Sequence, residues 1–322
     1  MTSYQEAGVD LEGAAQHVSN ITDIVTSTWT ARVVGGFGGF AAGVEIPDVY
    51  RNPVLMMSTD GVGTKLELAR RSGIWNGVGH DLVAMCVDDL AAVGAQPLGF
   101  VDYMAVGALD PKRDADIVAS IAAACSLAGC PLLGGETAEH PGVMEPDAVD
   151  LAGAAMGVLE KGSEWGPERV EMGDVVIGLM SPNLRSNGFS LVRSVLGDDL
   201  DNHIEQLLEP SVIYSPAVLP LADRVHSAAH ITGGGLADNL ARALPNGAGV
   251  QVDTTTWDVP DVFNLMRSRN VAPNGMWQTF NMGIGFCVVA DPADAQDVMS
   301  IVGDHDPRVI GEVTDGTGVE LV

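Results

Sequence analysis

The sequence predicts a mixed α/β or α+β protein built from two domains. Segments with strand character and segments with helix character intermix along both halves of the 322-residue chain, which favours a mixed fold over an all-helical or all-strand one. A polar stretch rich in turn residues, Lys161 to Asp174, separates the halves and predicts domains over residues 1–165 and 166–322. The pattern does not determine the strand order.

Composition narrows the class of protein. Hydrophobic residues make up 46% of the chain, yet no apolar run approaches the ~20 residues of a membrane span. The first ten residues lack the features of a secretion signal, so we expect a cytoplasmic protein. Sixteen basic residues against 43 acidic ones give a net charge of -27, which would repel nucleic acid and anionic lipid. The four cysteines form no C-x-x-C pair and are expected to be buried free thiols.

In the first half, apolar runs between turn signals predict strands, and helical periodicity or a helix-starting Asp-Pro predicts helices. The expected elements are a strand over Pro53–Thr59, helices over Thr64–Arg71 and Val78–Val93, a strand over Pro97–Gly107, a helix from Pro111 to Ala128, and strands at PLLGG and DLAGAAMGVLE.

In the second half, the same signals continue. The expected elements are a strand at DVVIGLM, helices from Asn187 and over Ser215–His226, a helix after HITGGG, strands at AGVQVD and GIGFCVVA, a helix over Pro292–Val302, and two short terminal strands.

The loop STDGVGTKLEL, Ser58 to Leu68, contains the residues of a phosphate-binding loop in an unusual order. Its glycines, Gly61 and Gly63, let backbone amides approach an anion, and Lys65 supplies a positive charge in a chain with only three lysines. Asp60 precedes them and would repel a phosphate. A carboxylate there is explained if it binds Mg²⁺ that in turn bridges phosphate oxygens.

The helix over Val78–Val93 carries a second set of carboxylates. Leu82, Val83, Cys86, Leu90 and Val93 fall on one face, which is the expected core face. Asp81, Asp88 and Asp89 fall on the other, with no lysine or arginine within a turn. This arrangement is either a solvated acidic face or a set of charges that a divalent cation neutralises.

Four further glycine clusters could contact a ligand, although each has a structural alternative. VVGGFGGFAAG, Val33 to Gly43, is a flexible connector or a lid over phosphates. LLGGETAEHPG places Glu136 just past a strand, in a cleft or in a surface loop. RSNGFS is an ordinary helix entry capped by Asn187, and ITGGGLADN is a tight turn or an anion site before a helix. The sequence contains no nucleophile motif, and the seven histidines are scattered.

Taken together, these stretches resemble the phosphoribosylformylglycinamidine cyclo-ligases, also called aminoimidazole ribonucleotide synthetases. The segments YQEAGVD, GGFGGF, STDGVGTKL, GHDLVAMCVDDLAAVGAQPLGFVDYMA, GGETAEHPG, SNGFSLVR, ITGGG and TFNMGIG occur in the order seen in that family. The resemblance covers essentially the whole chain.

The resemblance implies a reaction and an assembly. ATP phosphorylates the formamide oxygen of formylglycinamidine ribonucleotide, an amidine nitrogen attacks that carbon, phosphate leaves, and the ring closes to aminoimidazole ribonucleotide in purine biosynthesis. Phosphoryl transfer of this kind needs a metal ion and cationic stabilisation rather than a nucleophilic side chain. The family also implies ATP and Mg²⁺ as cofactors, and a homodimer in which N-terminal strands of two subunits pair.

The site residues implied by the resemblance form three groups. The catalytic candidates are Lys65, Asp89 and Glu136, with Asp60 and Asp89 on the metal. The candidates for ATP binding are Gly35, Gly36, Gly38, Gly39, Asp60, Gly61, Gly63, Thr64 and Lys65. The candidates for binding the substrate ribose phosphate are Ser186, Asn187, Gly188, Gly233, Gly234 and Gly235.

The chain departs from the family pattern at three positions. Asp88 stands where the family often has asparagine, which adds a charge beside the expected metal site. Arg185 stands where the family often has histidine, so no base role transfers to it, and Gln5 replaces a common lysine. The alternatives are a related ATP-binding enzyme, such as a thiamine-monophosphate kinase, a selenophosphate synthetase or a hydrogenase-maturation protein, or a nucleotide-binding regulatory protein without turnover.

Overall fold

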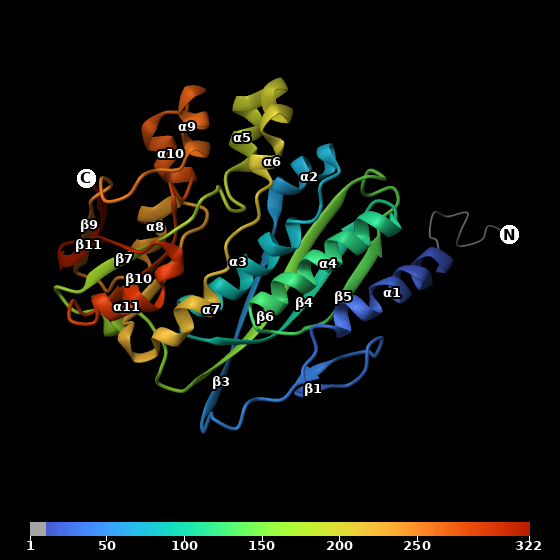
Figure 1. Ribbon diagram of the computed structural model, residues 1–322, viewed down its shortest axis with the longest axis horizontal. Coiled ribbons are helices and arrows are strands. Elements are labelled where there is room, and N and C mark those ends of the chain that lie inside the picture. Colours follow the sequence, from blue (N-terminus) through green and yellow to red (C-terminus); the bar gives the residue numbers. More distant parts are fainter. Residues whose placement is uncertain (1–10) are drawn as a thin grey trace.

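The computed structural model describes residues 11–322 and contains two separate main sheets, one in each half of the chain (Figure 1). The first has four strands in the order β3-β6-β4-β5, and the second has six in the order β12-β9-β11-β7-β10-β8. Helices and strands intermix in both halves, as the sequence predicts. The segment YQEAGVD, which includes Gln5, lies outside the described residues.

The four-stranded sheet consists of β3 (Pro53–Gly61), β4 (Gln96–Val106), β5 (Leu132–Glu139) and β6 (Val149–Glu160). β6 pairs antiparallel with both β3 and β4. β4 and β5 run parallel, because α4 (Pro111–Leu127) crosses between them. Asp110 caps α4 by accepting hydrogen bonds from the backbone amides of Lys112 and Arg113, each at 3.0 Å.

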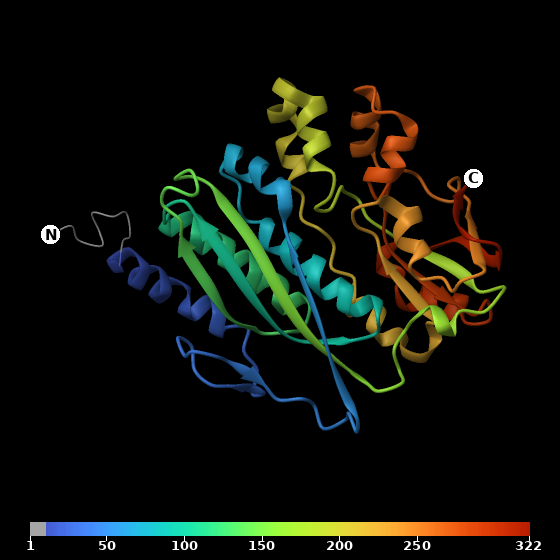
Figure 2. The same ribbon diagram turned by 180° about the vertical axis from the view of Figure 1, so that it is seen from behind.

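Within residues 11–322, helices cover one face of this sheet and leave the other without a helix (Figures 1 and 2). α3 (Val78–Ala92) and α4 lie against it, and α1 (Leu11–Thr26) packs beside α4. α3 and α4 approach closely at Gly79, where a Cβ atom would overlap the backbone of Ser120 and Ile121. The opposite face of the sheet exposes apolar side chains of β3 and β4.

The six-stranded sheet occupies the second half of the chain. Its strands are β7 (Val175–Met180), β8 (Ser227–His230), β9 (Ala248–Val252), β10 (Ile284–Ala290), β11 (Arg308–Asp315) and β12 (Gly318–Leu321). All neighbouring strands in this sheet pair antiparallel except β12 and β9, which run parallel.

Buried clusters lie on both faces of the second sheet, so it is a sheet enclosed by helices. The helices α7 (Ser215–Val218), α8 (Gly235–Ala241) and α11 (Ala295–Ile301) contribute to these clusters. The helices α5 (Phe189–Leu196), α6 (Ile204–Leu207), α9 (Asp261–Ser268) and α10 (Pro273–Thr279) bury side chains in the largest hydrophobic core.

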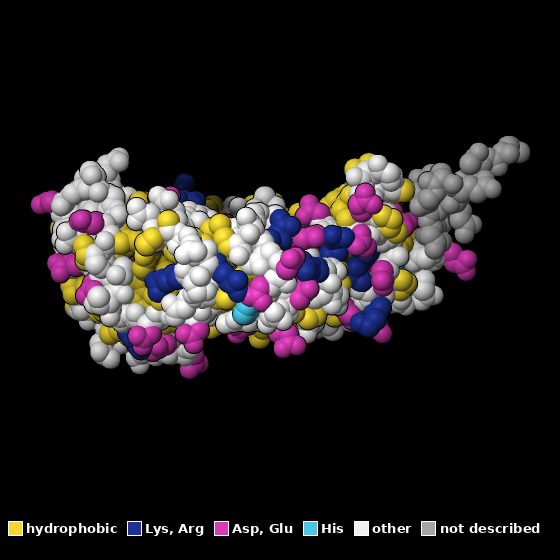
Figure 3. Space-filling view, turned by 90° about the horizontal axis from the view of Figure 1, so that it is seen from above, with side chains coloured by type: hydrophobic (Ala, Val, Ile, Leu, Met, Phe, Trp, Pro, Cys, Tyr) yellow, Lys and Arg dark blue, Asp and Glu magenta, His cyan; other side chains and the backbone are white. Residues whose placement is uncertain are grey.

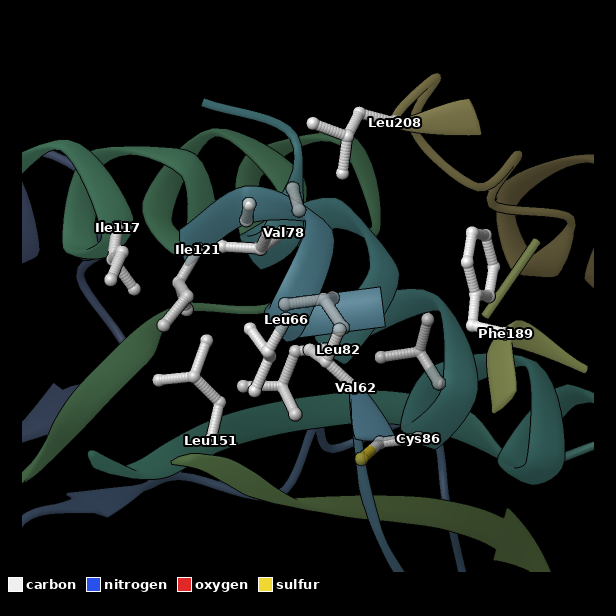
Figure 4. Close-up of a cluster of buried hydrophobic side chains, with 14 of the residues drawn as sticks. Val62, Leu66, Val78, Leu82, Cys86, Ile117, Ile121, Leu151, Phe189 and Leu208 are labelled. Carbon is white, nitrogen blue, oxygen red and sulfur yellow. The ribbon is translucent and has the colours of Figure 1, made fainter. Parts of the chain in front are cut away.

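The largest hydrophobic core joins the two halves. Figure 4 shows Leu82 and Cys86 of α3 with Phe189 and Leu208, which come from the second half of the chain. All four are at most 6% exposed. Burial of this apolar surface stabilises the contact between the halves, and it fixes α3 at their junction.

Lys and Arg side chains gather on the face seen in Figure 3, with Asp and Glu among them, and a charged pair also connects the halves. Arg71 on α2 (Leu66–Ser72) pairs with Asp201 of the second half at 2.8 Å, whereas the pair of Arg269 and Asp199 lies within the second half. The side chains of the Arg71 pair are 43% and 61% exposed, so water screens the pair and it contributes little to stability.

Some elements differ from the sequence predictions. α1 and the hairpin of β1 (Val33–Val34) and β2 (Gly43–Val44) were not predicted, and neither were β8, α9 and α10. β3 continues through Gly61, so Asp60 lies in the strand rather than in the loop after it. The four cysteines are buried and free, as predicted. In residues 11–322, no helix is both long and apolar enough to cross a membrane.

Candidate active site

Asp60 lies at the end of β3, at the junction of the two halves. One oxygen of its carboxylate accepts a hydrogen bond of 2.7 Å from the backbone amide of Gly61. Burial raises the pKa of Asp60, and the nearby negative charge of Asp89 raises it further. The structure therefore brings together the two carboxylates that the sequence analysis assigned to a metal.

Asp89 projects from α3 with each carboxylate oxygen held by a neighbour. Oδ1 lies 2.9 Å from Nδ1 of His230, and Oδ2 accepts a hydrogen bond of 3.2 Å from the hydroxyl of Ser58. Burial alone would raise the pKa of Asp89, but these hydrogen bonds outweigh it, and the pKa is lowered. The side chain is 47% exposed, so this carboxylate is oriented, ionised and open to a ligand.

His230, the last residue of β8, was not among the predicted site residues. Its side chain is only 2% exposed and stacks beside Phe286, with ring centroids 6.3 Å apart. It connects the second sheet to Asp89 across the junction. Its position at the end of an apolar strand, directly before the glycines of ITGGG, is the signal that could have revealed it.

Three predicted ligand-binding segments also meet at this junction. The hydroxyl groups of Thr64 and Ser190 lie 3.2 Å apart, which joins the loop after β3 to the start of α5. The side chain of Asn187 lies beside Gly233: a Cβ atom added to this glycine would be 3.4 Å from Oδ1 of Asn187. The segments 61–64, 186–190 and 233–235 therefore surround the same region as Asp60 and Asp89.

Lys65 is placed differently from the prediction. Its side chain is completely buried, and Nζ forms an ion pair with Asp81 at 2.8 Å. Nζ also donates to the backbone carbonyls of Arg185 at 3.2 Å and Glu209 at 2.8 Å. An ammonium group has three donors, and these acceptors use all of them. The prediction that Lys65 contacts phosphate is therefore corrected: in this structure it joins the two halves of the chain.

Asp81 and Asp88 are not part of a solvated face, because the segment 209–215 packs over this side of α3. Both side chains are 0% exposed. Asp81 accepts hydrogen bonds from the amide and hydroxyl of Ser211 as well as from Lys65. Asp88 pairs with Arg185 at 3.2 Å. Lys65 and Arg185 thus neutralise two of the three carboxylates, and Asp89 is the one of the three whose side chain stays exposed.

The lid glycines and Glu136 surround a different space. A cavity of about 700 Å³ is lined by Gly36, Gly38, Gly39 and Glu136, and its wall includes apolar residues of α1. Glu136 lies on β5, three strand spacings from β3, or about 14 Å. Within one chain, Glu136 is therefore not brought to the pair of Asp60 and Asp89.

Asp102 on β4 also lines this cavity and was not predicted. Burial raises the pKa of Asp102 from 3.8 to about 7, and a hydrogen bond from its own backbone amide lowers the pKa only in part. A lone carboxylate within the apolar strand FVDYMA is the sequence signal that could have identified it.

Because the pKa of Asp102 is higher in the folded protein than in the unfolded chain, its protonated form stabilises the fold. This stabilisation is complete at pH values below the unfolded pKa and is lost as the pH rises through about 7. We expect Asp102→Asn to increase the melting temperature relative to wild type more at pH 8 than at pH 5. Thermal melts at the two pH values test this, with the exposed surface substitution Asp116→Asn as control. An equal shift at both pH values would contradict it.

The pair of Asp60 and Asp89 fits Mg²⁺. Carboxylate oxygens are its preferred ligands, and it commonly takes one or two carboxylates together with waters and substrate phosphates. Ser58, two residues before Asp60 on the same face of β3, donates a hydrogen bond to Asp89, so both carboxylates lie where β3 meets α3 and a cation could neutralise them. Among the described residues, no group of three or more His, Cys, Asp and Glu side chains is arranged to hold a metal.

Comparison with family models identifies both halves of the chain. Residues 28–159 match the N-terminal domain, and residues 171–322 the C-terminal domain, of AIR synthase related proteins. The chain belongs to this family.

Curated relatives of the chain are phosphoribosylformylglycinamidine cyclo-ligases. That of Synechococcus sp. (strain CC9605) is 43% identical over 98% of this chain and 96% of its own length. The cyclo-ligase of Xanthomonas oryzae pv. oryzae (strain PXO99A) is 42% identical over 91% of this chain and 90% of its own.

Solved structures confirm the AIR synthase-like fold. Thiamine-monophosphate kinase from Stenotrophomonas maltophilia has a TM-score of 0.69 at 19% identity and covers 94% of this chain and 95% of its own. The hydrogenase maturation protein HypE, in a complex with ATP, also has a TM-score of 0.69 at 19% identity, over 96% of this chain and 88% of its own. At such identities the likeness establishes the fold alone.

Proposed function

We propose that this chain is a phosphoribosylformylglycinamidine cyclo-ligase, an enzyme that uses ATP to close the imidazole ring of aminoimidazole ribonucleotide. The observation that carries the proposal is the near full-length match to cyclo-ligases at 42–46% identity. The kinase and maturation-protein alternatives share only the fold.

The reaction proceeds in two balanced steps. The formamide oxygen attacks the γ-phosphorus of ATP, the bond to the β-phosphate oxygen breaks, and ADP leaves. An amidine nitrogen then attacks the activated carbon, the carbon–oxygen bond breaks, and inorganic phosphate leaves. The attacking nitrogen and the formamide nitrogen each lose one proton, and one of these two protons goes to the phosphate. Phosphorylation is needed because an amide oxygen is a poor leaving group, whereas a phosphate ester is a good one.

Asp60 and Asp89 are the residues that would hold Mg²⁺. The metal, when bound, would supply positive charge to the phosphate oxygens. Asp89 is suited to this role because Ser58 and His230 orient both of its oxygens. We propose that the amides of Gly61, Gly63 and Thr64 bind phosphate oxygens beside them.

The segments 186–188 and 233–235 are proposed to bind the substrate ribose phosphate. Gly233 is exposed, and the side chain of Asn187 lies beside it. The hydroxyl oxygen of Ser186 is buried and has no hydrogen-bond partner among the described residues, so it is free to contact a ligand.

We propose that the cavity beneath the loop Gly35–Gly39 contributes to ATP binding, with Glu136 positioning the nucleotide or substrate. Three of the glycines and Glu136 line it, and its apolar wall suits a nucleobase.

Hydrogen exchange tests this assignment of the loop. We expect exchange in residues 34–40 to slow when a non-hydrolysable ATP analogue and Mg²⁺ are added, because bound phosphates give the glycine amides acceptors. The segment 161–174 serves as a control that should not respond. Unchanged exchange of the loop at saturating analogue would remove it from the site.

A homodimer is proposed to form through the open face of the four-stranded sheet. Leu55, Met57, Val101 and Tyr103 are between 43% and 76% exposed there, which makes an apolar surface of the kind that partner subunits cover. We also propose the domain division at 165/166, and a cytoplasmic location, which suits four reduced cysteines.

The substitution Met57→Glu tests the dimer. We expect it to shift the protein from dimer to monomer in light scattering after gel filtration, because it places a charge in the buried part of the interface. Met172→Glu, at an exposed methionine outside this sheet, should leave the dimer intact. A dimer that persists in Met57→Glu would contradict the proposed interface.

Steady-state ADP formation tests the activity itself. It should depend on formylglycinamidine ribonucleotide and not respond to thiamine monophosphate. ADP formation that is independent of the first compound, or stimulated by the second, would refute the proposal.

A further inference from the structure

The two internal departures from the family pattern, Asp88 and Arg185, are in direct contact. Nη2 of Arg185 lies 3.2 Å from Oδ2 of Asp88, although 97 positions separate the two residues in the chain. The side chains are 1% and 0% exposed. Neither could be buried as an isolated charge without a large free-energy cost, so each requires the other.

The surroundings hold both charges in fixed positions. Oδ1 of Asp88 accepts hydrogen bonds from the amides of Tyr214 at 2.8 Å and Ser215 at 2.9 Å. Arg185 donates from Nη1 to the carbonyl of Val212 at 2.8 Å, and its guanidinium lies 5.1 Å from the ring centroid of Tyr214. The pair is therefore locked between α3 and the segment 212–215.

Arg185 has a left-handed backbone conformation, with φ of 58°. Its amide donates to Oδ1 of Asn183 at 3.0 Å, and its carbonyl accepts from Lys65 at 3.2 Å. A residue other than glycine takes this conformation at a cost, which these two contacts offset.

The guanidinium also fixes the hydrogen-bonding state of His230. Nη2 of Arg185 lies 2.7 Å from Nε2 of His230. A guanidinium can only donate, so Nε2 must be the acceptor and Nδ1 must carry the proton. Nδ1 then donates to Oδ1 of Asp89 at 2.9 Å.

We propose that Asp88 and Arg185 form a charge-balanced pair that positions Asp89 through His230. Arg185 holds the tautomer and orientation of His230, Asp88 neutralises Arg185, and His230 aims one oxygen of Asp89 while leaving the carboxylate accessible. All three are positioning residues. The part of the proposal that concerns Mg²⁺ rests on the proposed function, in which Asp89 holds the metal.

A double-mutant cycle tests the pair independently of activity. The variants are Asp88→Asn, Arg185→His and the double variant, which carries the residues of the family pattern, and the readout is the denaturant midpoint at pH 8. Each single substitution leaves a buried group unpaired and should lower the midpoint. The double variant should recover more than half of the summed losses. If the midpoint of the double variant falls by the sum of the two single losses, Asp88 and Arg185 do not act as a pair and the proposal is wrong.

Two further measurements test positioning. Nitrogen-15 NMR of the unliganded protein should show the proton of His230 on Nδ1. Arg185→Lys keeps the charge but cannot reach Asp88 and His230 together, so calorimetric Mg²⁺ affinity in the presence of an ATP analogue should fall ~10-fold or more, as for other residues that orient metal ligands. The exposed substitution Lys112→Ala should not change it.

A proton on Nε2, or unchanged Mg²⁺ affinity in Arg185→Lys, would overturn positioning by Arg185. The variant Asp89→Asn separates this failure from failure of the proposed function. If Asp89→Asn abolishes Mg²⁺ binding while Arg185→Lys does not affect it, only the positioning role is wrong. If Asp89→Asn has no effect either, the metal assignment itself is wrong.

Discussion

Replacing Asp89 by asparagine is expected to lower turnover by at least ~10²-fold, since loss of one electrostatic element of a phosphoryl-transfer site typically costs about 3 kcal/mol in the barrier. Asparagine keeps the shape of the side chain and an oxygen that can accept from His230. It removes the negative charge, which is present at neutral pH because hydrogen bonds from His230 and Ser58 lower the pKa of Asp89. The effect should therefore appear in catalysis and in the Mg²⁺ requirement, with little loss of stability.

The assay is substrate-dependent ADP formation over a Mg²⁺ titration, with a thermal melt of each variant. Asp116→Asn makes the same charge change on the exposed surface of α4 and should retain wild-type activity. Near-normal turnover of Asp89→Asn with unchanged Mg²⁺ dependence would show that this carboxylate does not contribute to the site.

Replacing Lys65 by methionine is expected to lower the free energy of unfolding by about 3–5 kcal/mol, the usual result of removing one partner of a buried ion pair. Asp81 would remain buried, with a charge that Ser211 alone would have to compensate. Two backbone carbonyls, of Arg185 and Glu209, would also lose their donor. Equilibrium denaturation measures the loss.

Two comparisons make the prediction specific. Lys112→Met breaks the ion pair with Asp116. The Lys112 side chain is 87% exposed, so water screens this pair, and the substitution should hardly change the free energy of unfolding. The double variant Lys65→Met/Asp81→Asn should be more stable than Lys65→Met alone. A loss at Lys65 no greater than that at Lys112, accompanied by a large activity defect, would support the original prediction that Lys65 contacts phosphate.

Local sequence patterns could predict most of the elements of the fold. The periodicity of α3 identified its core face correctly, because Leu82, Val83, Cys86 and Leu90 are buried as predicted. The same periodicity could not show what covers the opposite face. Asp81 and Asp88 are polar at helical spacing whether water or the segment 209–215 lies over them.

The candidate site was predictable only in part for the same reason. Asp60 and Asp89 could be paired because a strand end and a helix face each present a carboxylate. The partner of Lys65 could not be identified, since a lysine among glycines has the same local sequence whether it faces a phosphate or a buried aspartate. His230 meets Asp89 across 141 positions, and only the tertiary structure joins them.

Isotope transfer tests the central claim most directly. The substrate, formylglycinamidine ribonucleotide labelled with oxygen-18 in its formyl group, is converted with ATP and Mg²⁺, and the inorganic phosphate released is analysed by mass spectrometry. If the formamide oxygen is phosphorylated and then leaves on ring closure, one labelled oxygen must appear in each phosphate formed. Unlabelled phosphate, released together with ADP and the closed ring, would contradict this account.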